Sequence, residues 1–403
     1  MKKLLLLLAL LTTCSLADTQ VKGHVDMQVQ SYLTKPSGKH PQNYTASSEL
    51  ELTHIVEEFE FIAKLYAQQD YYDLKGSSEH NDRSFLRLDE MYLKYDGDTS
   101  QILVGKSIRF WGALEVDNIT DSFNPDDFRS DIFDADKLGT WNVSYTHYTD
   151  TGEIALIVKV DEQDRKMPAY PYVYYFFPEY VNYDSDLDTE HSANQPSVFL
   201  KYSDSTDSDT PLDFSIILEH GYDSQRYIDP INYQEHAYIV NKLSTYNTLV
   251  VGDTLYKLEA VYADVLNDKQ VSDYYHIGLG IEHTLTRFHD SADLGLLTEY
   301  YKYETLQDGK LNDLQLFESF QNDLFLGIRY SFNEGKDASI VTGVVFDLDY
   351  NEQNYYIEYE SRIADTFKLN FDYRYIEPSK NDLTTFNLMG RHQRVSLKLG
   401  YYF

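Results

Sequence analysis

The chain has almost no cysteine and little positive charge. Of its 403 residues one is Cys, and 34 Lys and Arg stand against 66 Asp and Glu, which gives a net charge of −32. A single Cys excludes a disulfide framework and a zinc site built from cysteines. An acidic excess of this size disfavours nucleic acid as a partner, because the phosphate backbone repels it.

Long apolar runs are also missing. After the N-terminus no run approaches the roughly 18 residues that a membrane-spanning helix needs. Aromatic residues are abundant instead, with 37 Tyr and 21 Phe, and this content argues against intrinsic disorder despite the acidity. A fold that needs neither disulfides nor apolar helices is therefore expected.

The N-terminus has the order of a secretory signal: a basic start, a short apolar run and small residues before Ala17. We expect residues 1–17 to be a signal peptide and residues 18–403 to form the mature protein. A lipoprotein signal at Cys14 is the alternative, which Thr13 directly before it disfavours. Either signal predicts export.

Polar and apolar residues alternate with a period of two from one end of the mature chain to the other, as in strands. The first segment places one apolar face opposite a polar one, with Val21, Gly23, Val25, Met27 and Val29 on the apolar side. The pattern predicts about 18 strands, with 16 as the alternative. They lie near 21–33, 47–56, 58–68, 84–95, 101–111, 138–147, 153–160, 196–202, 211–222, 234–245, 253–264, 274–285, 292–304, 322–332, 337–347, 354–362, 365–376 and 391–403.

A soluble sandwich and a membrane barrel share this alternation, and two features favour the barrel. Aromatic pairs lie at strand ends, where rings suit the boundary between lipid and water. The chain ends on Leu399, Tyr401 and Phe403, which resembles the terminal signal read by the bacterial barrel-assembly machinery. We expect an all-β, single transmembrane antiparallel barrel in the cell outer membrane, with short periplasmic turns and long outer loops.

The connection after the fifth expected strand is the most distinctive segment. It combines Trp111-Gly112 with Asp121, Asn124-Pro125 and Asp127. This spacing resembles a family of proteobacterial outer-membrane porin-like barrels, largely of unassigned function, with a Trp-Gly…Asp…Asn-Pro-x-Asp motif in the third outer loop. The sequence departs from that pattern at Glu115, where an Asp is expected. The resemblance implies a porin fold and a functional role for loop 112–137.

Three interpretations of this loop are open. Folded into a water-filled lumen, its acids would attract cations; the candidate constriction and selectivity residues are Glu115, Asp117, Asp121, Asp126, Asp127, Asp131 and Arg109. Alternatively, Asp121 and Asp127 accept hydrogen bonds from wall arginines such as Arg109 and only fix the loop to the wall. A divalent cation is a third option, but without EF-hand spacing we expect no metal and no cofactor.

These features predict a porin-like channel for passive or semi-selective diffusion of small solutes, with a preference for cations. The alternatives are a structural or adhesive barrel, and a specific transporter of a hydrophobic or sugar-type substrate. An enzyme is disfavoured, because no nucleophile motif accompanies the scattered histidines. The expected partners are outer-membrane lipid and lipopolysaccharide, the assembly machinery, small solutes and, in a homotrimer, further copies of the chain.

Overall fold

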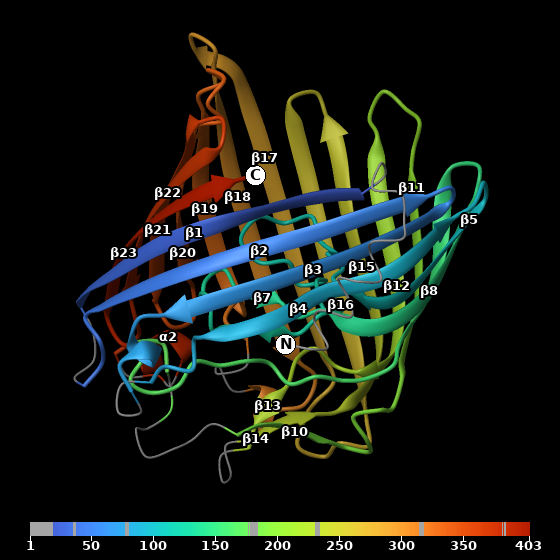
Figure 1. Ribbon diagram of the computed structural model, residues 1–403. Coiled ribbons are helices and arrows are strands. Elements are labelled where there is room, and N and C mark those ends of the chain that lie inside the picture. Colours follow the sequence, from blue (N-terminus) through green and yellow to red (C-terminus); the bar gives the residue numbers. More distant parts are fainter. Residues whose placement is uncertain are drawn as a thin grey trace, which may run out of the picture.

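A single closed sheet of 18 antiparallel strands forms the protein, as the computed structural model shows (Figure 1). The structure describes residues 19–34, 38–76, 80–175, 177, 184–229, 234–313, 318–380, 382 and 384–403. The sheet closes because the first strand pairs with the last, from His24 opposite Tyr402 to Thr34 opposite Gln393. The predicted 18-stranded antiparallel barrel is confirmed. The expected signal peptide, residues 1–17, lies outside the described residues.

The wall is built from strands that follow one another around the barrel in chain order. They are β1 (Thr19–Thr34), β2 (Gln42–Val56), β3 (Phe59–Asp70), β4 (Phe85–Asp96), β5 (Ser100–Ser107), β8 (Thr140–Tyr148), β9 (Gly152–Lys159), β11 (Ser197–Ser205), β12 (Leu212–Tyr222), β15 (Ile239–Val251), β16 (Thr254–Leu266), β17 (Tyr274–His289), β18 (Ala292–Thr305), β19 (Asn322–Ser331), β20 (Ser339–Asp347), β21 (Gln353–Ala364), β22 (Phe367–Glu377) and β23 (His392–Tyr402).

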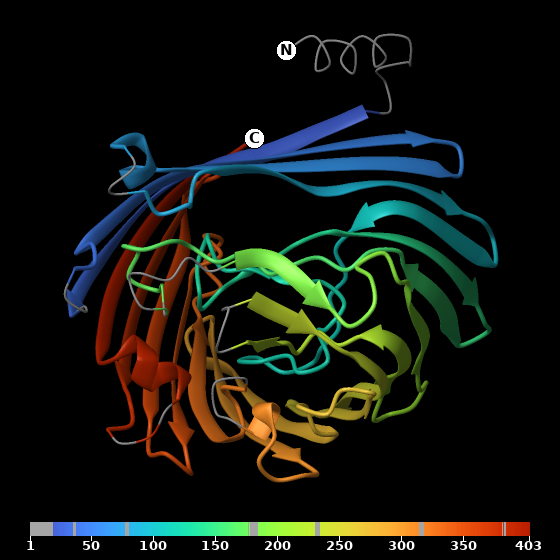
Figure 2. The same ribbon diagram turned by 90° about the horizontal axis from the view of Figure 1, so that it is seen from below.

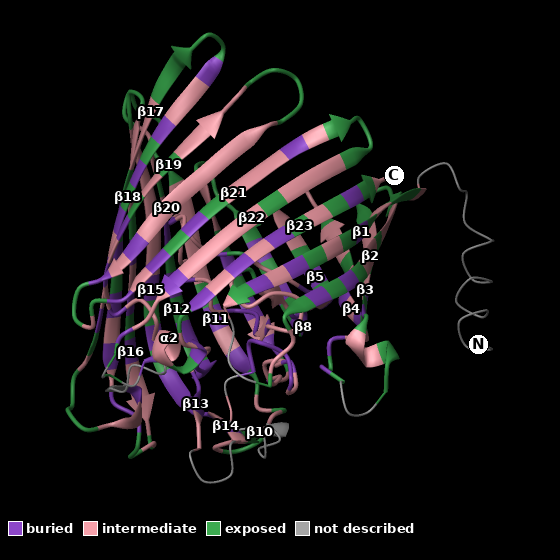
Figure 3. Ribbon diagram, turned by 90° about the vertical axis from the view of Figure 1, so that its left-hand side faces the viewer, coloured by how far each residue is buried: buried purple, intermediate pink, exposed green. Residues whose placement is uncertain are grey.

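Exposed and buried residues alternate along these strands (Figure 3). The outer face carries apolar side chains that no protein covers, among them Met27, Val104, Leu218 and Leu397. The inner face carries buried polar and charged groups such as Glu259 and Arg394. An apolar exterior around a polar interior is the arrangement of a barrel in a bilayer. In the described part of the chain, no helix has both the length and the apolar character to cross a membrane.

The two ends of the barrel differ as the sequence predicts. Short turns join the strands at one end, including the turn at Gly252 with φ of +58°. At the other end long connections fold over the mouth and carry a small sheet of β10 (Asp184–Thr189), β14 (Gln234–Ala237) and β13 (Tyr227–Ile228) (Figure 1). The short helix α2 (Thr385–Met389) belongs to the connection between β22 and β23 at the same end. Long connections mark the outer surface of such barrels.

Several expected strands differ from the observed bounds, and for two of them the structure gives the reason. The expected strand 234–245 combines the outer strand β14 with the start of β15, which continues to Val251 because the turn comes only at Gly252. The expected strand 101–111 ends early, since β5 leaves the wall after Ser107. The residues beyond Ser107 belong to the loop that occupies the lumen.

A bulge in β4 changes which residues face the lumen. Lys64 and Leu65 of β3 pair with Glu90 and Leu88, so Asp89 is the extra residue. At the bulge and before it in the chain, Asp89 and Arg87 point inward and are buried. After the bulge Leu93, which is also an odd-numbered position, points outward. A bulge inserts one residue and reverses the alternation beyond it. The strict period of two therefore does not identify Arg87 as a lumen residue.

Candidate functional site

The chain between β5 and β8 crosses the interior of the barrel (Figure 2). We call residues 108–139 the lumenal loop. Its neck is closed where Ser107 pairs with Thr140. Asn124 bridges the neck, because its Nδ2 donates to Ser107 O at 3.1 Å and to Leu138 O at 2.8 Å while its Oδ1 accepts from Arg109 N at 2.8 Å. The loop therefore leaves and re-enters the wall at one point and extends inward from it.

The Trp-Gly pair fixes the first turn of the lumenal loop. Trp111 is buried and packs against Phe123 and the wall residue Phe199, with ring centroids 5.5 and 5.6 Å away. Gly112 faces the side chain of Asn118 so closely that a Cβ would overlap it. A side chain at position 112 would therefore push the segment around Asn118 away from the turn. The Trp-Gly motif thus has a steric basis.

Two wall carboxylates hold the inner half of the loop through its backbone. Glu259 on β16 accepts from the N–H groups of Ala113, Leu114 and Thr120, at 2.5, 3.0 and 3.0 Å. Glu299 on β18 accepts from the N–H groups of residues 115 and 116, at 2.7 and 3.1 Å. Hydrogen bonds to an ionised acceptor are stronger than neutral ones. The two carboxylates thereby satisfy five loop donors and place the loop against β16–β18.

A second anchor joins the outer half of the loop to β4. Arg87 donates to Asp127 Oδ2 at 2.6 Å and to Asp136 at 3.1 Å, and Arg129 of the loop also donates to Asp127, at 2.8 and 2.9 Å. Burial would raise the pKa of Asp127, but the hydrogen bonds and charges of Arg129 and Arg87 outweigh it and lower that pKa below its ordinary value. Asp127 is therefore a charged anchor.

A third anchor joins the loop to β23, the last strand of the barrel. Arg394 on β23 donates from Nη1 to both oxygens of Asp131, at 2.8 and 2.7 Å, and from Nη2 to Asp372 at 2.9 Å. Burial opposes ionisation of Asp131, yet Arg394 lowers its pKa below the ordinary value. In the inner half of the loop, Glu115 forms an ion pair with Arg329 of β19. The lumenal loop is thus tied to β4, β16, β18, β19 and β23.

Two acids of the loop, Asp117 and the exposed Asp134, form no ion pair with a Lys or Arg of the described residues. Asp121 and Asp126 share Lys137, at 3.4 and 2.9 Å, whereas no Lys or Arg in the described ranges forms an ion pair with Asp117. Asp117 is partly exposed, and the hydroxyl of Tyr301 accepts a hydrogen bond from its backbone N–H at 3.1 Å. Burial and the carboxylates of Glu318 and Glu259 raise the pKa of Asp117 well above its ordinary value.

Beside Asp117 lies a cavity of about 210 Å³ between the loop and the wall. Its charged lining consists of the acids Asp117, Asp121, Asp126, Glu162 and Glu318 and the bases Lys137, Lys159, Arg165, Arg226 and Lys242. The wall bases are buried and paired: Lys159 with Glu162 at 2.7 Å, Lys242 with Asp223 at 2.5 Å and Arg226 with Glu235 at 3.2 Å.

Glu318 is the second acid of the cavity that has no Lys or Arg partner among the described residues. It accepts hydrogen bonds from Gln225 and from Phe320 N, both at 3.0 Å, and lies 3.7 Å from the imidazole of His276. Among the described side chains no Lys or Arg is paired with it. The acidic side chains Asp117 and Glu318 are therefore the members of the charged lining described above that have no Lys or Arg partner. Over the same ranges, no group of three His, Cys, Asp or Glu side chains is arranged to hold a metal ion.

The contacts of two sequence candidates differ from those expected. Arg109 does not contact Asp121 or Asp127; its Nη2 donates to Asn142 and Ser144 of β8, at 3.2 and 2.8 Å. Asp127 is held by the wall arginine Arg87 instead, and Asp121 accepts from Trp111 N at 3.2 Å. The hypothesis that a wall arginine fixes the loop names the wrong residue, because the bulge at Asp89 conceals Arg87 in the alternation.

The connection between β9 and β10 is rich in Tyr and Phe, and part of it packs into the mouth of the barrel. Tyr172 and Tyr174 are buried against Tyr32 of β1, and the hydroxyl of Tyr174 lies 2.8 Å from His392 Nε2. The neighbouring Arg83 guanidinium lies 4.1 Å from the centre of the Tyr172 ring. These rings pack inside the barrel mouth. Phe176, Tyr180 and Tyr183 of the same loop lie outside the described residues.

The comparisons with known proteins agree on the fold. No known protein family matches the chain, and no curated protein is similar to it in sequence. Similar solved structures include OccAB4 of Acinetobacter baumannii, with 11% identity over 96% of this chain and 98% of that one, and a TM-score of 0.58. The BenF-like porin from Pseudomonas fluorescens Pf-5 has 9% identity, covers 96% and 99%, and gives 0.57.

Proposed function

We propose that this protein, an outer-membrane barrel with the closed 18-stranded sheet of porins and an apolar outer face, is a channel for passive or semi-selective diffusion of small solutes. The lumenal loop is its constriction. The observation that carries this proposal is the loop itself, which crosses the lumen and is tied to five wall strands. An 18-stranded barrel is wide enough for an aqueous path, and an inward loop narrows such a path.

We further propose that the channel prefers cations. Most candidate acids act as anchors: Glu115, Asp121, Asp126, Asp127 and Asp131 each have a basic partner. Asp117 and Glu318 have no Lys or Arg partner among the described residues, and both line the cavity beside the loop. Unpaired carboxylates in a narrow aqueous space attract cations and repel anions. Selectivity therefore rests on Asp117 and Glu318 rather than on the whole acidic loop.

The Trp-Gly…Asp…Asn-Pro-x-Asp motif supports membership of the porin-like family that it resembles. In this chain the motif residues shape and attach the lumenal loop. Trp111 and Gly112 form its first turn, Asn124 bridges its neck and Asp127 binds Arg87 of the wall. These motif residues contact only other residues of the loop or the wall residues that hold it. We propose that the motif specifies an inward loop and leaves the solute to the residues around it.

The experiment that tests the channel is single-channel recording of the refolded mature protein in a planar bilayer. Stepwise conductance increases are expected. A protein whose heat-modifiable gel mobility demonstrates a folded barrel, but which gives no conductance, would overturn the proposal and favour a structural barrel. Liposome swelling with uncharged solutes of increasing size then measures how far the lumenal loop narrows the path.

A further inference from the structure

A second cavity adjoins the cavity beside the lumenal loop. It has a volume of about 210 Å³ and lies between the outer end of β18 and the connections that follow β18 and β20. We call it the outer cavity, and the one beside the loop the inner cavity. The charged lining of the outer cavity consists of four acids and one base: Glu304, Asp308, Glu318, Asp349 and Lys302. Because Glu318 lines both cavities, the two spaces meet at its side chain.

Neutral side chains link Glu318 to the outer cavity. Gln225, which lines the inner cavity, donates to Glu318 at 3.0 Å. Tyr303, which lines the outer cavity, donates to Gln225 at 3.4 Å and accepts from Asn312 at 3.1 Å. The resulting chain of hydrogen bonds runs from one cavity to the other, and Glu318 is its charged member. A solute that moves from the outer cavity to the inner one therefore passes this carboxylate.

Acids of the outer cavity outnumber the base that faces them. Lys302 pairs with Glu304 at 3.3 Å, whereas neither Asp308 nor Asp349 forms an ion pair with a Lys or Arg of the described residues. Both of these acids are exposed. They lie at the outside, Glu318 lies at the junction and Asp117 lies at the loop. Carboxylates in series along a narrow space concentrate cations and repel anions.

A buried carboxyl group in the wall beside the outer cavity points to the same ligand charge. Gln321 lines this cavity, and its carbonyl continues the ladder of β18 by accepting from Tyr303 N at 2.9 Å. Asp323 follows two residues later, so it lies on the same face of the strand, and it is 1% exposed. Its Oδ1 has no hydrogen-bond partner in the described part of the chain, and its register partner is another acid, Asp347. A cation nearby would stabilise such a pair.

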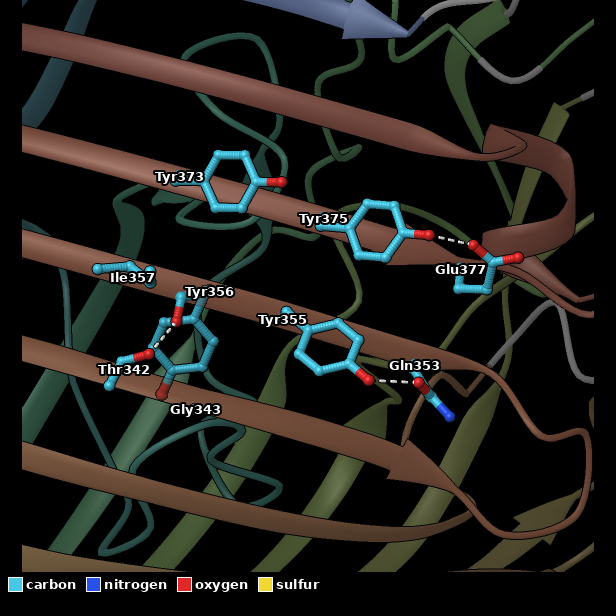
Figure 4. Close-up of a pocket in the computed structure, with 9 residues that line it drawn as sticks. All are labelled: Thr342, Gly343, Gln353, Tyr355, Tyr356, Ile357, Tyr373, Tyr375 and Glu377. Carbon is cyan, nitrogen blue, oxygen red and sulfur yellow. Dashed lines mark hydrogen bonds between the residues drawn. The ribbon is translucent and has the colours of Figure 1, made fainter.

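The groove on the outside of β20, β21 and β22 does not share this charge pattern (Figure 4). Its volume is larger, about 540 Å³, but its lining contains one acid, Glu377, and that acid is paired with Arg391. The uncompensated acids therefore follow the route through the outer and inner cavities and are not a general property of the hollows of this acidic protein.

The dimensions and the lining favour a small organic cation over a bound metal ion. Each cavity is smaller than the roughly 300–1,000 Å³ of pockets for drug-sized ligands. The acids are spread along the route, and over the described ranges no three His, Cys, Asp or Glu side chains are arranged to hold a metal ion. Tyr303 and Tyr350 also line the outer cavity, and tyrosine rings attract ammonium and guanidinium groups.

We propose that the solutes favoured by the channel are small organic cations with an ammonium or guanidinium group, and that they enter through the outer cavity, pass Glu318 and reach the lumenal loop at Asp117. This route rests on the proposed channel and adds the class of solute. The acids attract the charged end of the solute, while the tyrosine rings contact its body. An anion of the same size is repelled at each step.

The test compares putrescine and succinate, two four-carbon probes of opposite charge, in proteoliposomes that contain the full mature protein. The wild type should admit putrescine about tenfold faster than succinate. An Asp308→Asn, Asp349→Asn variant should lower this ratio several-fold, because it removes two charges from the outer cavity. Asp82→Asn, Asp382→Asn is the matched control, since these exposed acids belong to other outer connections and line neither cavity. Its ratio should equal that of the wild type.

A wild type that admits both probes equally, or a control that loses the preference as far as the outer-cavity variant, would overturn the route. Glu318→Gln should also lower the ratio, and an unchanged ratio contradicts passage at the junction. Conductance in potassium chloride separates this inference from the proposed function. A folded barrel without conductance is not a channel, whereas a conducting protein without a preference for putrescine remains a channel and contradicts the solute class alone.

Discussion

Arg87 of β4 donates a hydrogen bond of 2.6 Å to Asp127 of the lumenal loop, and both side chains are buried. This bond links the barrel wall to the segment that crosses its interior. Because a buried charge needs its partner, removal of one member costs more than the pair itself contributes. The pair therefore determines whether the outer half of the loop stays at the wall.

Asp127→Asn should loosen this anchor. The amide keeps the size of the carboxylate but leaves Arg87 and Arg129 with less negative charge, at a cost of about 3–5 kcal/mol for a buried pair. We expect larger open-channel current noise and faster proteolysis within residues 108–139. Asp126→Asn is the control, because Asp126 is more exposed and shares Lys137 with Asp121. Equal noise in the two variants would contradict the anchor.

Glu259→Gln and Glu299→Gln should release the inner half of the loop. Each amide presents an NH2 group where the loop presents N–H donors, so at least one of the N–H groups of residues 113–116 and 120 loses its acceptor. The expected result is a higher single-channel conductance. Glu358→Gln, which affects a lumen carboxylate bound to Arg374 at 2.6 Å, is the matched control. If Glu358→Gln raises the conductance as much as the other two variants, the increase does not come from release of the loop.

Gly112→Ala should deform the lumenal loop. The added Cβ would overlap the side chain of Asn118, so the turn after Trp111 must open, at a cost of about 1–3 kcal/mol. A lower thermal stability of the refolded barrel and an altered conductance are expected. Gly295→Ala is the control, since a Cβ there meets its nearest neighbour, Arg329, at 3.5 Å. Its stability should match the wild type.

Cation preference should weaken on acidification before the loop detaches. The folded pKa of Asp117 is raised, so this carboxyl takes up a proton as the pH falls toward the raised value, above the ordinary Asp pKa of about 3.9. The pKa values of Asp127 and Asp131 are lowered, so their contribution to stability is complete above the ordinary value and lost only as the pH falls through the lowered ones.

The measurement is the reversal potential across a pH series. Near the ordinary Asp pKa, the potential should have moved toward zero while the conductance is still that of the anchored loop. Asp117→Asn should remove the pH-dependent part of this change. A potential that stays constant until the conductance also changes would show that the anchors, and not Asp117, titrate first.

The alternation of polar and apolar residues was sufficient to predict the strands of the barrel wall and the direction in which most of their side chains point. The alternation of β1, with Val25 and Met27 outward and Asp26 inward, has one interpretation once one face is apolar. It failed at Arg87, because the bulge at Asp89 reverses the faces and a bulge has no reliable sequence signal. The alternation also places the charged Lys106 on the outward face beside Val104. Its Nζ donates to Leu88 O at 2.8 Å.

The site was predicted in outline and not in its contacts. The sequence identified Asp117, Asp127 and the Asn124-Pro125 turn, because acids, Asn and Pro have local preferences. It could not separate Asp117 from Asp131, since their difference arises from Arg394, more than 260 residues away in the chain. Glu318 was missed for the same reason: it lies in an outer connection, and only the fold brings it to the cavity. The assembly role of Leu399, Tyr401 and Phe403 and the homotrimer stay predictions.

The most direct test of the account is the reversal potential of the wild-type protein and of an Asp117→Asn, Glu318→Gln variant in a planar bilayer under a potassium chloride gradient. The account predicts a cation-selective potential for the wild type and a potential close to zero for the variant, with similar conductance. An anion-selective wild-type potential, or a variant that keeps its cation preference, would contradict the claim that these two unpaired carboxylates control passage beside the lumenal loop.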